Sequence, residues 1–161
     1  MLWVFLLWAQ SAVDQQLQRG QALFVDTSHG CATCHSLKGH GTAVGPDLSV
    51  MGRLSPSAIA TAVRSSVTEY VQTVKLKSGE SFPGMPAGQT ETTVQFYDVS
   101  KTPPELRQLE RAAVQSTTDQ NVWKHPPSAA GYTDQQLADI IAYLRSVVTG
   151  TAKNVSPADI Q

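Results

Sequence analysis

The strongest periodic pattern lies near the C-terminal end of the chain. Apolar residues recur there every three to four positions, which is the spacing of an amphipathic helix. They are Leu137, Ile140, Ile141, Leu144 and Val148. Thr133 and Gln136 have the spacing of a capping box, and Gly150 is placed to end the helix. We therefore predict a helix between Thr133 and Gly150, followed by a polar and mobile tail over residues 151–161.

Three shorter helices are predicted earlier in the chain. Residues 14–24 repeat apolar and small side chains along one helix face. Ser55 suits the N-cap of a second helix and Pro56 suits its first turn. The apolar face of that second helix would be Ile59, Val63 and Val67. Pro103–Pro104 is expected to open a short third helix carrying Leu106 and Leu109.

Between the second and third helices the apolar period changes from that of a helix to that of a strand. Val74 and Leu76 alternate with lysines, a turn follows at residues 78–80, and residues 92–99 alternate again. Gly and Pro are frequent over residues 82–88, so we expect an irregular excursion there. The pattern thus predicts a mainly α fold with a small β-hairpin insertion over about residues 70–100.

The N-terminal residues 1–12 form a separate segment. Leu2–Ala9 is apolar but far shorter than the roughly 20 residues that span a bilayer. It has the apolar core of a secretory signal peptide with cleavage after Ala12, although a basic start is missing. The alternative is a retained apolar segment that is buried or docked on a partner. Residues 13–150 would form the folded domain, with no transmembrane span in the mature chain.

Composition narrows the function. The chain has 161 residues, a formal charge of −1 and two cysteines. The charge gives no reason to expect nucleic acid as a partner. Two cysteines exclude a disulfide-dense scaffold and a four-cysteine zinc or iron–sulfur site within one chain.

The two cysteines stand in the string Cys31-Ala32-Thr33-Cys34-His35. This spacing indicates covalent attachment of one haem c, because two thiols so placed can reach the two vinyl groups of one porphyrin. His35 then follows as the proximal iron ligand. A zinc site would need a fourth ligand, and a thioredoxin-like pair would be expected near a βαβ unit.

These residues resemble the class I monohaem c-type cytochromes. Besides the attachment string, residues 45–48 read Gly-Pro-Asp-Leu, with Pro46 eleven positions after His35. The resemblance implies a cytochrome c fold in which the carbonyl of Pro46 accepts a hydrogen bond from the proximal histidine. It also implies a crossing of the first and last helices at Gly20, Phe24 and Tyr143. Residues 70–148 are similar to cytochrome domains that carry a strand-rich insertion before the last helix.

The sixth iron ligand departs from the family pattern. Such cytochromes usually place a Met-Pro pair shortly before the last helix, and here the string is Trp123-Lys124-His125-Pro126. His125 is therefore our preferred distal ligand. Met85 has the Met-Pro pair but lies forty residues earlier, inside the insertion. The remaining alternatives are Met51 and an iron whose sixth position is open or bound to water.

The leading functional hypothesis is electron transfer between redox partner proteins in the periplasm or outside the cell. No local motif groups an acid, base and nucleophile, so we do not expect an enzyme. One alternative is a haem subunit docked in a larger redox assembly. A gas sensor or peroxidase-like site is another, and it would require an open sixth position on the iron.

Overall fold

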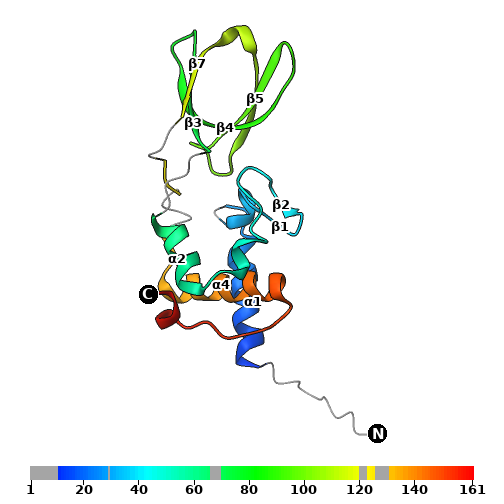
Figure 1. Cartoon of the computed structure of the whole chain (residues 1–161), viewed down its shortest axis with the longest axis vertical. Helices are drawn as coiled ribbons and strands as arrows, with labels where there is room; N and C mark the ends of the chain where they lie inside the picture. Colours follow the sequence, from blue (N-terminus) through cyan, green and yellow to red (C-terminus); the bar gives the residue numbers. More distant parts are fainter. Residues whose placement is uncertain (1–10, 29, 66–69, 120–122, 126–130) are drawn as a thin grey trace, which may run out of the picture.

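The computed structural model describes residues 11–28, 30–65, 70–119, 123–125 and 131–161. The apolar segment predicted to be a signal peptide therefore lies almost wholly outside the described residues. A group of helices forms one end of the molecule and an antiparallel sheet the other (Figure 1). None of the described helices is long and apolar enough to cross a bilayer.

The helical end is built on the crossing of α1 (Ala12–Phe24) and α4 (Asp134–Thr149). The capping box of Thr133 and Gln136 begins α4, and Gly150 ends it in a left-handed conformation, both as predicted. At the crossing, a β-carbon on Gly20 would lie 2.6 Å from the carbonyl carbon of Asp139 and 2.9 Å from Cβ of Tyr143. Only glycine permits this approach, so the crossing implied by the family resemblance is confirmed.

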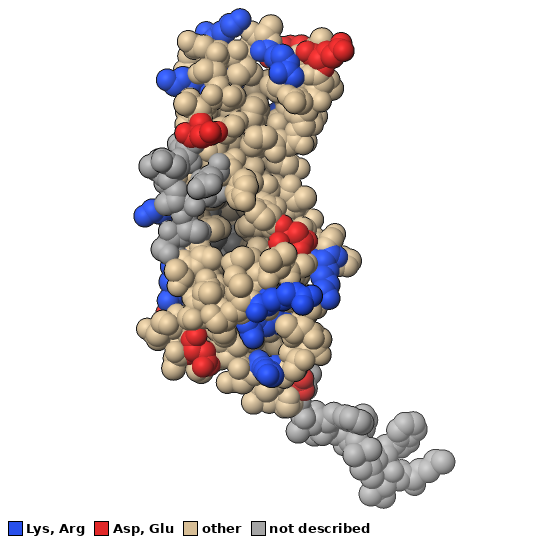
Figure 2. Space-filling model, viewed as in Figure 1, with Lys and Arg blue, Asp and Glu red and all other residues tan. Residues whose placement is uncertain are grey.

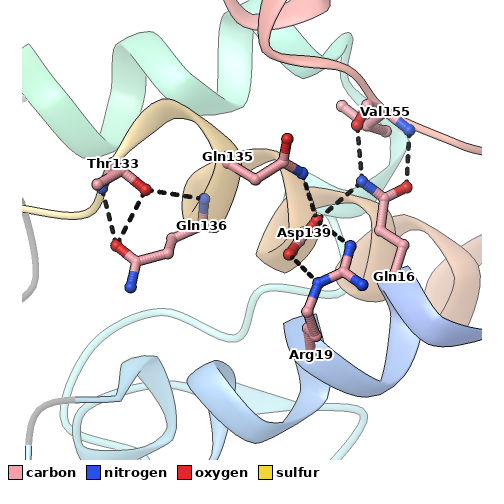
Figure 3. Close-up of polar contacts among 7 residues, drawn as sticks. All are labelled: Gln16, Arg19, Thr133, Gln135, Gln136, Asp139 and Val155. Carbon is pink, nitrogen blue, oxygen red and sulfur yellow. Dashed lines mark hydrogen bonds and ion pairs between the residues drawn. The ribbon is translucent and has the colours of Figure 1, made fainter.

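A buried polar network fastens the C-terminal residues to this crossing. The Gln16 amide donates to the Val155 carbonyl at 2.7 Å and accepts from its N–H at 3.1 Å. Gln16 also donates to Asp139, which bonds Arg19 and Gln135 as well (Figure 3). The tail then forms η4 (Pro157–Ile160) and packs on α2 and α4.

The prediction of a mobile tail is therefore wrong. Val155 and Ile160 are each 3% exposed and belong to the main hydrophobic core. The rest of that core comes from α1, α2 (Pro56–Ser65), α4 and Leu37. Ser55 caps α2 as predicted, since its hydroxyl accepts the N–H of Ala58 at 3.2 Å. Short elements complete the helical end: η1 (Cys31–Thr33), β1 (Ser36–Leu37), β2 (His40–Gly41) and η2 (Met51–Arg53).

The other end is a five-stranded antiparallel sheet with the strand order β6-β5-β4-β3-β7. Its elements are β3 (Gln72–Leu76), β4 (Ser81–Gln89), β5 (Thr93–Asp98), β6 (Glu105–Glu110), η3 (Arg111–Ala113) and β7 (Val114–Asp119). The last strand returns to pair with the first, and Gln72 faces Asp119. The chain thus leaves the sheet beside the point where it enters. The sheet has its own small core, formed by Val74, Leu76, Phe82, Val94 and Phe96.

The predicted fold class, mainly α, is wrong because the strand-rich part is a full sheet rather than a hairpin. Residues 82–88 belong to β4, where Gly84 is needed because a β-carbon would lie 2.6 Å from Val74. A register shift between Pro86 and Gly88 accommodates the remaining irregular residues. The predicted third helix is also wrong, since it is strand β6 and the sheet continues to Asp119.

Candidate functional site

The two cysteines lie at the start of a tight turn that follows α1. The carbonyl of Cys31 accepts the N–H of Cys34 at 3.1 Å and that of His35 at 2.8 Å, which brings the three side chains onto one short segment. No disulfide joins the two thiols. Burial raises the pKa of Cys31 to about 11 and also raises the pKa of Cys34. Both are therefore neutral thiols at neutral pH, half-buried and free to form a covalent bond.

The imidazole of His35 has a fixed orientation. Its Nδ1 lies 2.7 Å from the carbonyl oxygen of Pro46, as the family resemblance implied. Because a carbonyl only accepts, Nδ1 carries the proton and the lone pair is on Nε2. Burial lowers the pKa of His35, against the opposing effects of Pro46 and Asp47. A neutral imidazole with a directed lone pair is the form that binds metals.

The loop that carries Pro46 is itself held from two sides. The carbonyl of Cys34 accepts the N–H of Gly45 at 2.6 Å, and Asp47 accepts the hydroxyl of Ser36 at 2.7 Å. Hydrogen bonds from Ser49 and Ser36 hold the pKa of Asp47 well below its usual range. A β-carbon on Gly45 would lie 2.5 Å from Cε1 of the His35 ring. The backbone at Gly45 therefore lies directly against the proximal imidazole.

His125 reaches the same place from the C-terminal end of β7, which lies beside the start of β3. It belongs to the segment between β7 and α4, and its ring centroid lies 6.1 Å from that of His35, with the two ring planes at 36°. Burial lowers the pKa of His125, and the nearby His35 lowers it further. Trp123 lies beside it, with ring centroids 5.8 Å apart and planes at 56°. The structure thus brings the predicted proximal and distal ligands together.

The two methionine alternatives lie in regular elements. Met85 is half-buried in β4, where it pairs with Tyr97 of β5. Met51 begins η2, whose Gly52 packs against Leu144 and Val148 of α4. Among the described residues, no group of three or more His, Cys, Asp or Glu side chains is placed to hold a bare metal ion.

Two residues of the site were missed by the sequence analysis. Gly45 stands out in the sequence only as the residue before Pro46, and Trp123 only as a residue near His125. A glycine directly before the accepting proline and a tryptophan two positions before the expected ligand were the available signals. Neither signal reveals that the residue contacts an imidazole, because both contacts depend on how the loops fold.

Comparison with known protein families supports the assignment of the attachment residues. The family model of cytochrome c matches residues 17–114. The match includes Cys31, Cys34, His35 and Pro46, and it ends before His125 and α4. No curated protein matches the chain.

Proposed function

Because the chain belongs to the cytochrome c family, we propose that it is an electron carrier whose single haem c is ligated by His35 and His125. Members of the family carry covalently bound haem c, and the family is one of electron transfer. We propose one haem because the two cysteines of the chain suffice for one attachment. When bound, the haem supplies an iron that alternates between the ferrous and ferric states.

The distance between the two imidazoles carries this proposal. An imidazole nitrogen binds first-row metal ions such as zinc at about 2.0–2.1 Å. The ring centroid lies about 1.1 Å behind that nitrogen, given ring bonds of about 1.33 Å. Two imidazoles on opposite sides of one metal ion therefore have centroids about 6.3 Å apart. The centroids of His35 and His125 are 6.1 Å apart, so these two imidazoles have the separation that two ligands of one haem iron would need.

The chain's own residues keep this arrangement the same in both oxidation states. Pro46 fixes the tautomer and direction of His35, and Gly45 prevents its ring from moving back. Burial keeps both imidazoles neutral and limits access of water. Two ligands that stay in place reduce the rearrangement that accompanies electron transfer. This arrangement supports a carrier rather than an enzyme, because no coordination position is left for a substrate.

Replacement of His125 by Met is the direct test. A methionine and a histidine together give a higher potential than two histidines, other things being equal. We expect H125M to raise the midpoint potential and to introduce a methionine–iron charge-transfer band in the near infrared. M85L is the matched control, with wild-type spectrum and potential expected. An unchanged spectrum and potential in H125M, with a change in M85L, would transfer the distal role to Met85.

Carbon monoxide separates the carrier from a sensor or peroxidase-like site. A ferrous protein with both axial positions filled should show no change in its optical spectrum when carbon monoxide is added. Rapid formation of a carbonyl spectrum would indicate an open sixth position and would count against ligation by His125.

We further propose that the protein works outside the cytoplasm with redox partner proteins. The apolar Leu2–Ala9 segment supports export, and cytochrome c domains are usually exported or periplasmic. On the face shown in Figure 2, acidic and basic side chains are interspersed over the sheet end, and a group of basic ones lies over the helical end. Fractionation of the source cells tests the location.

A subunit of a larger redox assembly is the second candidate. The exposed edge strand β7 favours it, because five of its six residues are exposed and no strand of the described residues pairs with its outer edge. The apparent size of the haem-stained species in native extract separates the two. A small species supports the free carrier, and a large one supports the assembly.

A further inference from the structure

The direction of the Pro46 carbonyl depends on the residues beside it. Pro46 has no N–H of its own that a hydrogen bond could hold. Its carbonyl lies in the same peptide plane as the N–H of Asp47, because the peptide bond is planar. On the other side, the N–H of Gly45 is bonded to the carbonyl of Cys34 at 2.6 Å. The aim of the carbonyl at His35 is therefore set by Gly45 before it and by Asp47 after it.

Asp47 is held at both of its carboxylate oxygens. Its Oδ2 accepts the hydroxyl of Ser36 at 2.7 Å, and its Oδ1 accepts the N–H of Ser49 at 2.7 Å. The bond from Ser49 closes a turn within the loop itself. The bond from Ser36 ties that turn to the residue directly after His35. Because Asp47 is exposed, these contacts and not burial keep its side chain in place.

We propose that Asp47 is a positioning residue that directs the Pro46 carbonyl at the proximal imidazole and so lowers the midpoint potential. This inference rests on the proposed ligation by His35. A hydrogen bond from Nδ1 to an acceptor raises the basicity of a metal-bound histidine. A more basic ligand stabilises ferric iron relative to ferrous iron, which lowers the potential. The contacts of Asp47 matter here more than its charge, because an exposed charge is screened by water and salt.

The test separates the contacts of Asp47 from its charge. D47A removes both. D47N removes the charge only, since an amide oxygen can accept the N–H of Ser49 and an amide nitrogen can donate to the hydroxyl of Ser36. D159A is the matched control. Asp159 lies in η4 and likewise accepts a serine hydroxyl and a serine N–H, both of Ser156 at 2.7 Å.

Each variant is purified as the holoprotein, and its midpoint potential is measured at low and at high salt, together with its optical spectrum and thermal unfolding. We expect D47A to raise the potential, so that the ratio of ferrous to ferric protein at a fixed applied potential increases by up to about tenfold, the lower end of the range for loss of the acceptor itself. D47N should stay close to the wild type at both salt concentrations. D159A should keep the wild-type potential even where its thermal stability falls. The N–H of Leu48 still donates to the carbonyl of Ser36 at 2.8 Å in D47A, so the loop should remain folded.

Two results would overturn the proposal. One is a wild-type potential in D47A. The other is a D47N potential as high as that of D47A, and a shift that shrinks at high salt would then assign the effect to charge. If D47A does not accumulate, S36A loses only the hydroxyl contact and should shift the potential in the same direction; an unchanged potential there would also overturn the role of Asp47. A methionine–iron charge-transfer band in the wild type would instead overturn ligation by His125, and the comparison at Asp47 would stand because it concerns His35.

Discussion

Substitution of Gly45 by Ala tests whether the proximal histidine is held by its backbone neighbours. The added β-carbon would lie 2.5 Å from Cε1 and 2.8 Å from Nδ1 of His35. Carbon atoms in contact are normally about 3.5–4.0 Å apart, so the ring must withdraw by about 1 Å. If the ring moves away along its hydrogen bond to Pro46, the distance from Nδ1 of His35 to the carbonyl oxygen of Pro46 would increase from 2.7 Å to about 3.7 Å. That distance is too long for a hydrogen bond.

Loss of that hydrogen bond should be visible at the iron. Changing the partner of a metal-bound histidine typically costs 10–100-fold in metal affinity or activity. Because the haem is held by two thioethers, it should stay attached while the His35–iron bond weakens. We expect G45A to show partial high-spin character and a raised midpoint potential, with haem content unchanged on denaturing gels.

The matched control for G45A is A43S, which alters an exposed residue of the same loop. It should keep the wild-type optical spectrum and potential. A G45A protein that is low-spin with an unchanged potential would refute the reasoning, because it would show that the ring can withdraw without loss of its orientation.

Three further expectations concern the helical core. G20A should destabilise the protein by about 1–3 kcal/mol, measured by denaturant unfolding, because its β-carbon meets the backbone of Asp139. Q18A, at an exposed position of the same helix, should change little. D139N should destabilise the protein at neutral pH. Burial tends to raise the pKa of Asp139, but its hydrogen bonds with Arg19, Gln16 and Gln135 hold the net pKa below the usual value. The stabilisation is therefore present above about pH 4, the unfolded pKa, and is lost as pH falls through the lower folded pKa. The difference between D139N and wild type should shrink over that range; a constant difference would contradict this. I160A should cost about 2 kcal/mol or more, because Ile160 is 3% exposed. An unchanged unfolding midpoint would mean that the tail is not part of the core.

The helices could be predicted from the sequence because each carries its own signals. The capping box and Gly150 of α4 and the Ser55 cap of α2 act within a few residues, and most of the buried residues of α4 are apolar. The attachment residues were predictable for a similar reason, because the spacing of the two cysteines is set by the size of one haem. The role of Pro46 was predicted only from the resemblance to class I cytochromes.

The sheet was underestimated because its strands depend on partners far along the chain. β4 contains residues such as Gly84 that are typical of loops, and it is a strand because it pairs with β3 on one side and β5 on the other. Gly84 suits this place because Val74 and Phe96 leave no room for a side chain. β7 is polar and exposed, so it has no apolar alternation to detect. Leu106 and Leu109 have helical spacing, yet only Leu109 packs on the sheet core. The contact of Trp123 with His125 was equally invisible, since it depends on where β7 ends.

The sheet also affects the distal ligand through the length of loop that precedes it. Gln72 pairs with Asp119, so a folded sheet joins its two connections directly. About a dozen residues then separate α2 from His125 in effective length, instead of about sixty in an unfolded insertion, while about nine separate His125 from Asp134 of α4 in both cases. Because the chain from α2 to α4 is a closed loop with or without ligation, the loop entropy that the sheet saves is about 0.3 kcal/mol, or about twofold. A double substitution of the sheet core, V74A with F96A, should therefore unfold the insertion and let carbon monoxide displace His125 about twofold more readily. Replacement of residues 72–119 by a short Gly-Ser linker should restore the wild-type affinity for the gas, although it removes the whole sheet. Equal affinities in the two variants would show that the sheet acts on His125 through contacts and not through loop length.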